Sequence, residues 1–127
     1  MKAGIVTAVA LGGAIGSVAR YLVSTIQSPT WTGFPYGIFI VNVSGGFIMG
    51  VMAELMALKF SVSPEMRAFL ATGIMGGYTT FSTFSLESAL LIERQAYVTA
   101  AGYVAGSAIL SIAALFFGLW IVRMIYA

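Results

Sequence analysis

The chain has 127 residues, the length of a single domain, and 60% of them are hydrophobic, whereas only 8% are charged. A chain this short cannot bury so much apolar surface in one core, so we expect much of that surface to face lipid. The absence of Cys and His excludes thiol and imidazole catalysis, disulfides and the usual zinc sites, and the dispersed net charge of +2 argues against a nucleic-acid partner.

The first predicted membrane span covers residues 3–26. An apolar run after Met1–Lys2 also begins secretory signal peptides, but this run is longer than a signal core and no small-residue cleavage site precedes a polar domain. Gly12, Gly16 and Arg20 recur at every fourth position, on one helix face. We interpret the glycines as a packing face, and Arg20 either reaches the membrane interface or stands at a pore mouth.

A polar loop with two prolines, residues 27–35, leads to the second predicted span, residues 36–58. Asn42 is the only Asn of the chain and lies at membrane depth, where an amide without a partner is costly. It either joins two helices by hydrogen bonds or offers its two N–H donors to an anion. Glu54, near the end of this span, is expected to lie simply at the membrane interface.

The third predicted span, residues 66–92, contains poor helix material. Gly76 and Gly77 precede two threonines, and eight hydroxyl-bearing residues fall between Thr72 and Ser88. One interpretation is a flexible helix whose hydroxyls bond back to its own carbonyl oxygens. The other, which we favour, is a helix broken at a binding or permeation site, because irregular backbone at membrane depth must be buried in protein or line a wet cavity.

Glu87 lies late in the third span, where a carboxylate is either functional or part of an ion pair, for which Arg20 is a candidate partner. In the fourth predicted span, residues 96–125, three hydroxyl residues recur at every fourth position: Tyr103, Ser107 and Ser111. They form either a polar track or, for the serines, a small-residue packing face.

Short loops between four spans make neighbouring helices antiparallel and place both termini on one side of the membrane. That side carries four of the basic residues outside the first span, whereas the other side carries Arg94. This bias is weak and leaves both orientations, and therefore an antiparallel dimer, open. Aromatic residues mark the two interfaces: Trp31, Phe34 and Tyr36 at one, Trp120 and Tyr126 at the other.

Three segments carry a specific pattern: GGAIGSVARY at 12–21, GIFIVNVSGG at 37–46 and GGYTTFSTFSLE at 76–87. Together they resemble the Fluc family, the fluoride channels of bacteria. The third segment is the most specific, and the resemblance covers essentially the whole chain. Phe39 and Ile40 occupy a stretch where many members of the family have a Thr, which weakens any claim for a polar contact there but not the resemblance.

The resemblance implies an all-α integral membrane protein, a single domain over residues 1–127 with four transmembrane helices and a broken third helix. It implies an antiparallel, dual-topology homodimer in the plasma (inner) membrane with two pores that let fluoride leave passively. It also implies a structural Na⁺ at the centre of the dimer interface, held by backbone carbonyl oxygens of Gly76 and Thr79 from both subunits.

The resemblance further implies which side chains face the ion. Arg20 and Glu87 match vestibule positions. The residues that match the fluoride pore are Asn42, Phe81, Ser82, Thr83, Phe84, Tyr103, Ser107 and Ser111. Their chemistry suits a small, strongly hydrated anion, because hydroxyl and amide donors replace water and a phenyl ring has a positive edge.

Two rival functions differ from this one in class. A small multidrug-resistance-type exporter also has four short helices and forms dual-topology dimers, but its coupling carboxylate lies in the first helix, and residues 3–26 contain none. A non-transporting assembly subunit would explain the glycine faces but not the hydroxyl track. We do not expect an enzyme, because no acid–base or nucleophile–base pair is evident.

Overall fold

The computed structural model describes residues 2–26 and 33–126, and every regular element within these ranges is helical. The elements are α1 (Ala3–Ser24), α2 (Tyr36–Leu58), α3 (Pro64–Arg67), the π-helix η1 (Ala68–Met75), α4 (Gly76–Tyr78), α5 (Phe81–Glu93) and α6 (Tyr97–Tyr126). Three of them, α1, α2 and α6, are long and apolar enough to cross a membrane. The prediction of an all-α, multi-pass membrane protein is therefore confirmed.

The helix ends lie close to the predicted ones. The predicted second span coincides with α2, α6 lies one residue later than predicted, and α1 ends at Ser24 rather than at residue 26. The third segment begins at Pro64 instead of residue 66, because proline suits the first turn and the Ser63 hydroxyl caps it by accepting the Met66 N–H. Trp31, a predicted interface marker, lies outside the described residues.

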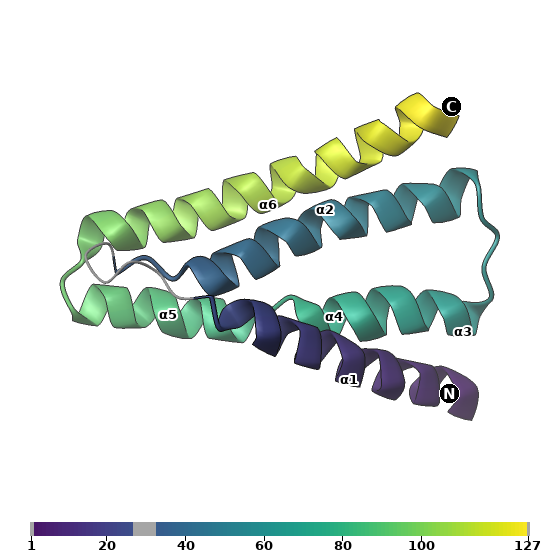
Figure 1. The fold of residues 1–127 in the computed structure, drawn as a ribbon, viewed down its shortest axis with the longest axis horizontal. Helices are drawn as coiled ribbons and strands as arrows, with labels where there is room; N and C mark the ends of the chain where they lie inside the picture. Colours follow the sequence, from purple (N-terminus) through teal and green to yellow (C-terminus); the bar gives the residue numbers. More distant parts are fainter. Residues whose placement is uncertain (1, 27–32, 127) are drawn as a thin grey trace.

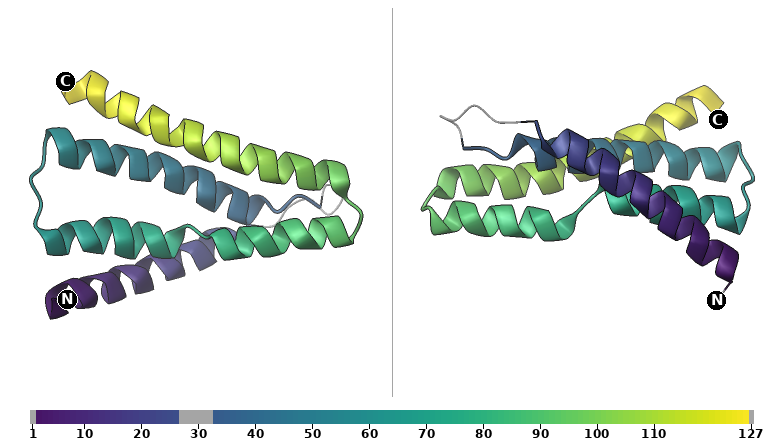
Figure 2. Two further views of the ribbon diagram at one scale, coloured as in Figure 1. Left: turned by 180° about the vertical axis from the view of Figure 1, so that it is seen from behind. Right: turned by 60° about the horizontal axis from the view of Figure 1, so that its bottom comes forward.

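The helices pack in two groups. In one, α6 lies along α2; in the other, α1 crosses η1 and α4, the first half of the third segment, as Figures 1 and 2 show from three sides. After the break, α5 leaves the neighbourhood of α1 and packs against α6. The third segment therefore contacts α1 before the break and α6 after it.

Glycines allow the close approach within each group. A Cβ added at Gly118 would lie 2.5 Å from the Phe47 carbonyl oxygen of α2, and one added at Gly77 would lie 2.6 Å from the Gly13 carbonyl oxygen of α1. In contrast, a Cβ on Gly102 would meet nothing within 4 Å. The predicted packing role of the glycines in the first span is confirmed, since Gly12 and Gly16 both lie directly against η1 backbone.

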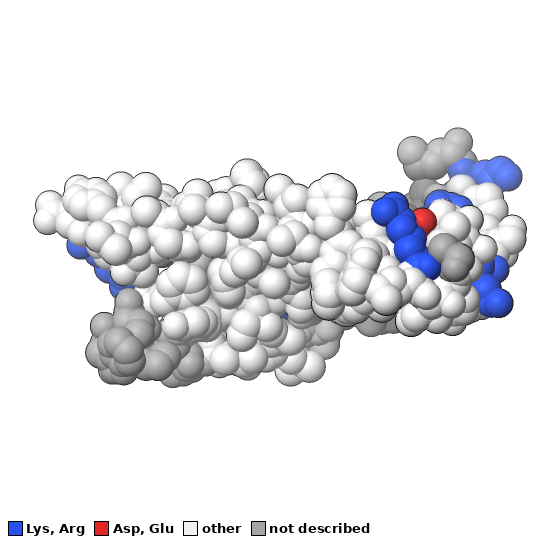
Figure 3. All heavy atoms as spheres, turned by 90° about the horizontal axis from the view of Figure 1, so that it is seen from above, with Lys and Arg blue, Asp and Glu red and all other residues white. Residues whose placement is uncertain are grey.

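Most charged side chains lie toward the ends of the molecule, and the face drawn in Figure 3 shows little charge between them. Glu54, expected at the membrane interface near the end of its span, lies in the last turns of α2 and is only 8% exposed, since it accepts a hydrogen bond from the Arg123 Nε of α6 at 2.7 Å. Its interfacial depth stays a prediction.

Candidate functional site

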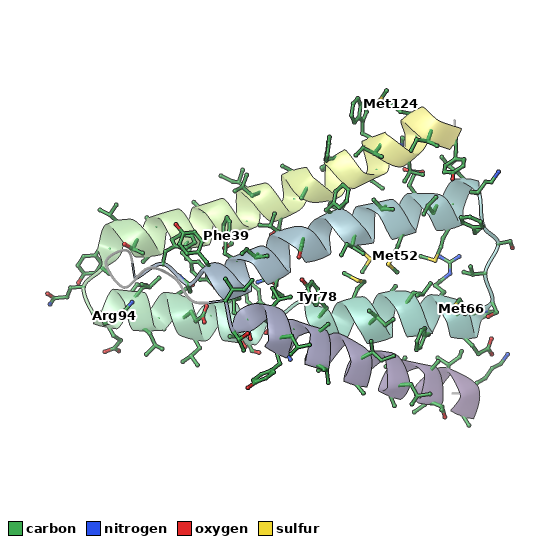
Figure 4. All side chains as sticks on the ribbon, viewed as in Figure 1. Phe39, Met52, Met66, Tyr78, Arg94 and Met124 are labelled. Atoms are coloured by element: carbon green, nitrogen blue, oxygen red, sulfur yellow. The ribbon has the colours of Figure 1, made fainter. Side chains whose placement is uncertain are left out.

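The third segment is interrupted at Thr79 and Thr80, whose backbones are extended, with φ, ψ of −83°, 155° and −150°, 126°. The predicted break is thus confirmed. Hydroxyls on either side do bond back to carbonyl oxygens of their own helices, as the alternative expected, and Ser85 to Phe81 is one case. Tyr78, the last residue of α4, points toward α2 (Figure 4), where its hydroxyl lies 2.9 Å from that of Ser44.

Asn42 of α2 bridges the break. Its Nδ2 donates to the Thr80 carbonyl oxygen at 3.1 Å, and its Oδ1 accepts the Thr80 N–H at 3.0 Å. One amide side chain therefore satisfies both polar groups of a residue outside any helix. This supports the interpretation that Asn42 joins two segments, and it leaves the second Nδ2 hydrogen for another acceptor.

Two N–H groups that a continuous helix would direct to the carbonyl oxygens of Gly76 and Thr79 are used elsewhere. The Thr80 N–H, which would bond the Gly76 carbonyl oxygen, goes to Asn42. The Thr83 N–H, which would bond the Thr79 carbonyl oxygen, goes to the Thr80 hydroxyl at 3.1 Å. The break therefore removes the regular helical donors from the carbonyl oxygens of both residues.

A pocket of about 390 Å³ opens beside the break. α2, the break, α5 and α6 all contribute to its walls, which bring residues from distant parts of the chain together. Six of the predicted site residues line it: Asn42, Thr79, Phe81, Phe84, Ser107 and Ser111. The walls are otherwise apolar or glycine, apart from Thr80.

The hydroxyls of Ser107 and Ser111 are buried and have no hydrogen-bond partner among the residues that the structure describes. A serine in a helix usually bonds its own backbone, as Ser88 does with the Phe84 carbonyl oxygen. A buried hydroxyl left unpaired costs free energy, so two of them on the wall of one pocket are donors available to a bound species.

Two phenyl rings flank the pocket. Phe81, directly after the break, is 79% exposed, and its ring centroid lies 5.6 Å from that of the half-buried Phe84. Phe84 in turn contacts the ring of Tyr103, with centroids 5.2 Å apart. The rings thus extend from the exposed side of the break into the core.

Tyr103 does not line the pocket. It is fully buried in the core formed with Ile38, Leu91 and Ala100, and its hydroxyl donates to the Glu87 Oε2 at 2.9 Å. The hydroxyl stripe of α6 is therefore split: the two serines face the pocket, while the tyrosine is engaged within the core.

The remaining predicted site residues lie outside the pocket walls. Ser82 is exposed, with its hydroxyl 3.3 Å from that of Thr80, and Thr83 is half-buried. Arg20 is half-buried on α1 and forms no ion pair with any described carboxylate. The alternative of an Arg20–Glu87 ion pair was therefore wrong, because Glu87 is bonded by Tyr103 instead.

Thr80 is the residue at the break to which the sequence analysis assigned no role. It is 9% exposed, caps the N-terminus of α5 and lines the pocket. A threonine just before a helical run is a recognised N-cap signal, so the capping was detectable in the sequence. Its pairing with Asn42, 38 residues away, was not.

Comparison with known proteins places this arrangement in a family. Residues 7–119 match the family described as CrcB-like protein, Camphor Resistance (CrcB). A protein of Nitrobacter winogradskyi, named fluoride-specific ion channel FluC, is 50% identical over 127 residues, covering 98% of this chain and all of the relative. Relatives of the same name from Caulobacter vibrioides and Rhodospirillum centenum are 51% and 50% identical, each over 94% of this chain and 95% of the relative.

Proposed function

The chain belongs to the CrcB family, and from that premise we propose that it is a fluoride-selective ion channel through which fluoride leaves the cell passively. Relatives that are about 50% identical over nearly the full length are named fluoride-specific ion channels. An ion channel is not an enzyme. No observation on the described residues favours the proton-coupled exporter.

The unpaired hydroxyls of Ser107 and Ser111 are the observation that carries the proposal. Fluoride holds its hydration shell strongly, so a pathway has to offer hydrogen-bond donors in place of water. The two hydroxyls and the free Nδ2 hydrogen of Asn42 are such donors on the wall of one pocket. The Nδ2 hydrogen of Asn42 can only donate, so it favours an anion over a cation.

The rings of Phe81 and Phe84 support an anion in the same pocket. The edge of a phenyl ring is electropositive, so it attracts an anion without binding it as tightly as a charged group. Weak sites in succession let an ion enter and leave. We assign Phe81, Phe84, Asn42, Ser107 and Ser111 to the pathway. Its further proposed members are Ser82, Thr83 and Tyr103.

A structural Na⁺ fits the carbonyl oxygens of Gly76 and Thr79. Their regular helical donors, the Thr80 and Thr83 N–H groups, are used elsewhere, which leaves both oxygens able to accept a cation. Carbonyl oxygens are hard ligands that suit Na⁺, and the cation would add positive potential near the pathway.

We further propose that the third segment is a fourth membrane span and that the protein is an antiparallel homodimer in the plasma membrane. Phe81 is 79% exposed, and Ser82 next to it is exposed as well, although lipid offers a hydroxyl no hydrogen-bond partner. A second copy of this chain would cover that surface. It would also complete the Na⁺ site with a second pair of carbonyl oxygens. Arg20 and Glu87 are proposed to lie at the vestibules.

Fluoride efflux from proteoliposomes tests the function. Vesicles loaded with fluoride and chloride receive a K⁺ ionophore, and ion-selective electrodes follow both anions. We expect rapid fluoride release with chloride retained. If inserted, dimeric protein released no fluoride, the proposal would fail and the exporter or assembly interpretation would take its place.

A further inference from the structure

We infer that Thr80 is the positioning residue of the break, which keeps the carbonyl oxygens of Gly76 and Thr79 free and sets the direction of Phe81. The inference rests on the proposed function for its consequence, but its geometric basis is independent. Thr80 itself is not assigned to ion contact here; it acts through its neighbours.

The Thr80 side chain controls the Thr79 carbonyl oxygen. Its hydroxyl accepts the Thr83 N–H at 3.1 Å, the donor that would otherwise bond that oxygen. Because the hydroxyl caps α5, the helix begins at Phe81 and not a residue earlier. Without the hydroxyl, the Thr83 N–H is left to reach the Thr79 carbonyl oxygen and extend α5 backwards through the break.

The Thr80 peptide controls the Gly76 carbonyl oxygen. Its N–H is held by Asn42 and its carbonyl oxygen accepts from the same amide, so this residue is fixed to α2 on both sides. Thr80 is 9% exposed, which shields these bonds from competing water. The two bonds and the cap together oppose any shift of the break along the segment.

Phe81 follows directly and depends on this anchor. Its ring is 79% exposed, and its ring contact within the chain is with Phe84. Since so little else in one chain orients the ring, the backbone direction at Thr80 decides where it points. A break displaced by one residue would turn Phe81 by about 100° around the helix axis.

The test compares Thr80→Val, which keeps the shape and removes the hydroxyl, with Thr80→Ser, which keeps the hydroxyl. Thr80→Ala serves as a second hydroxyl deletion in case the valine variant does not fold. Two quantities are measured: fluoride efflux from proteoliposomes, and the shift of the thermal unfolding midpoint of the dimer between NaCl and choline chloride. The matched control is Thr7→Val, since the Thr7 hydroxyl is exposed and bonds only its own helix, at the Ala3 carbonyl oxygen.

We expect Thr80→Val and Thr80→Ala to reduce fluoride efflux roughly tenfold, as expected for losing a helix cap and the geometry it sets, and to abolish the sodium-dependent shift. Thr80→Ser and Thr7→Val should keep both. A merely structural role would lower the midpoint in both salts equally and leave the shift intact.

Wild-type efflux and stability in the folded hydroxyl-deletion variants would overturn the inference, as would a wild-type midpoint that does not respond to Na⁺. If the wild-type protein released no fluoride but its unfolding midpoint did respond to Na⁺, the proposed function would fail. The sodium-dependent shift of the midpoint would then still test the role of Thr80.

Discussion

At the scale of single residues, the pocket serines are distinguished by what they do not bond. Ser24 represents the ordinary case, since its hydroxyl donates to the Tyr21 carbonyl oxygen of its own helix at 2.8 Å. Ser107 and Ser111 lack such a bond although they are also helical. A hydroxyl that gives up its local acceptor is free to turn toward an ion.

Ser107→Ala and Ser111→Ala should each reduce fluoride efflux roughly tenfold, the consequence of losing a donor worth about 1.4 kcal/mol to the passing ion. The dimer should remain intact, because alanine packs equally well at both positions. Efflux from proteoliposomes measures the effect, with Ser24→Ala as the control that keeps full flux. Undiminished efflux in the double serine variant would remove both residues from the pathway.

Phe81→Ile replaces the ring by an aliphatic side chain that lacks the positive edge. We expect fluoride efflux to fall by about twofold to tenfold, in line with about 0.5–1.5 kcal/mol for a ring interaction, without loss of the dimer. Phe116→Ile on α6 is the matched control, because that side chain is also exposed, at 62%, but lies outside the pocket. Equal flux from both variants would mean that the Phe81 ring does not meet the ion.

At the scale of elements, the α2–α6 pair depends on glycine. A Cβ at Gly50 would collide with the Leu115 carbonyl oxygen of α6, an atom that cannot move without the helix. Gly50→Ala should therefore lower the free energy of unfolding by about 1–3 kcal/mol. Gly102→Ala, where a Cβ meets open space, should leave it unchanged or raise it by up to about 1 kcal/mol. Denaturant titration in detergent measures both, and equal effects would contradict this account of the packing.

Glu54 and Arg123 join α2 and α6 near the C-terminal ends of both helices. Removing the guanidinium in Arg123→Ala leaves a nearly buried carboxylate without its partner and should destabilise the protein by about 1–3 kcal/mol. Adding Glu54→Gln should restore much of that loss, because no unpaired charge remains. Arg67→Ala, at an exposed side chain that forms no ion pair with any described carboxylate, should have little effect. If the double variant were less stable than Arg123→Ala, the buried charge would not be the cause.

At the scale of the whole molecule, both termini lie at one end (Figure 1), together with the loop that carries Lys59 and the start of the third segment with Arg67. Arg94 lies at the opposite end, as Figure 4 shows. The few basic residues on each side therefore set the orientation of insertion. An antiparallel dimer requires that both orientations are populated.

Two variants with opposite charge bias test this requirement. Arg94→Gln should fix the terminal end in the cytoplasm. Lys2→Gln, Lys59→Gln and Arg67→Gln together leave that end with Arg123, which is paired with Glu54, and should favour the reverse orientation. Reporters fused to the C-terminus measure the orientation. Each oriented variant alone should lose most fluoride efflux, and co-expression should restore it. Full efflux from either variant alone would rule out the antiparallel dimer.

The sequence by itself determined the helical spans and the position of the break. A helix needs about 20 mainly apolar residues to cross the hydrocarbon core of a membrane. The hydrophobic stretches of the sequence therefore predicted α1, α2 and α6. The glycine pair before two threonines made Thr79–Thr80 the weak point, because both residue types disfavour helix. The motif there also supplied Thr79, Phe81 and Phe84, three of the six predicted site residues that line the pocket.

Only the tertiary structure decided how these residues pair. Asn42 meets Thr80 across 38 positions, and Arg123 meets Glu54 across 69. Such contacts depend on how helices cross and rotate, which composition and spacing do not specify. The same crossing of α6 over α2 and α5 turns two serines toward the pocket and buries Tyr103 in the core. The π-helix η1 likewise had no local signal, since its wide turns arise where the third segment packs against α1.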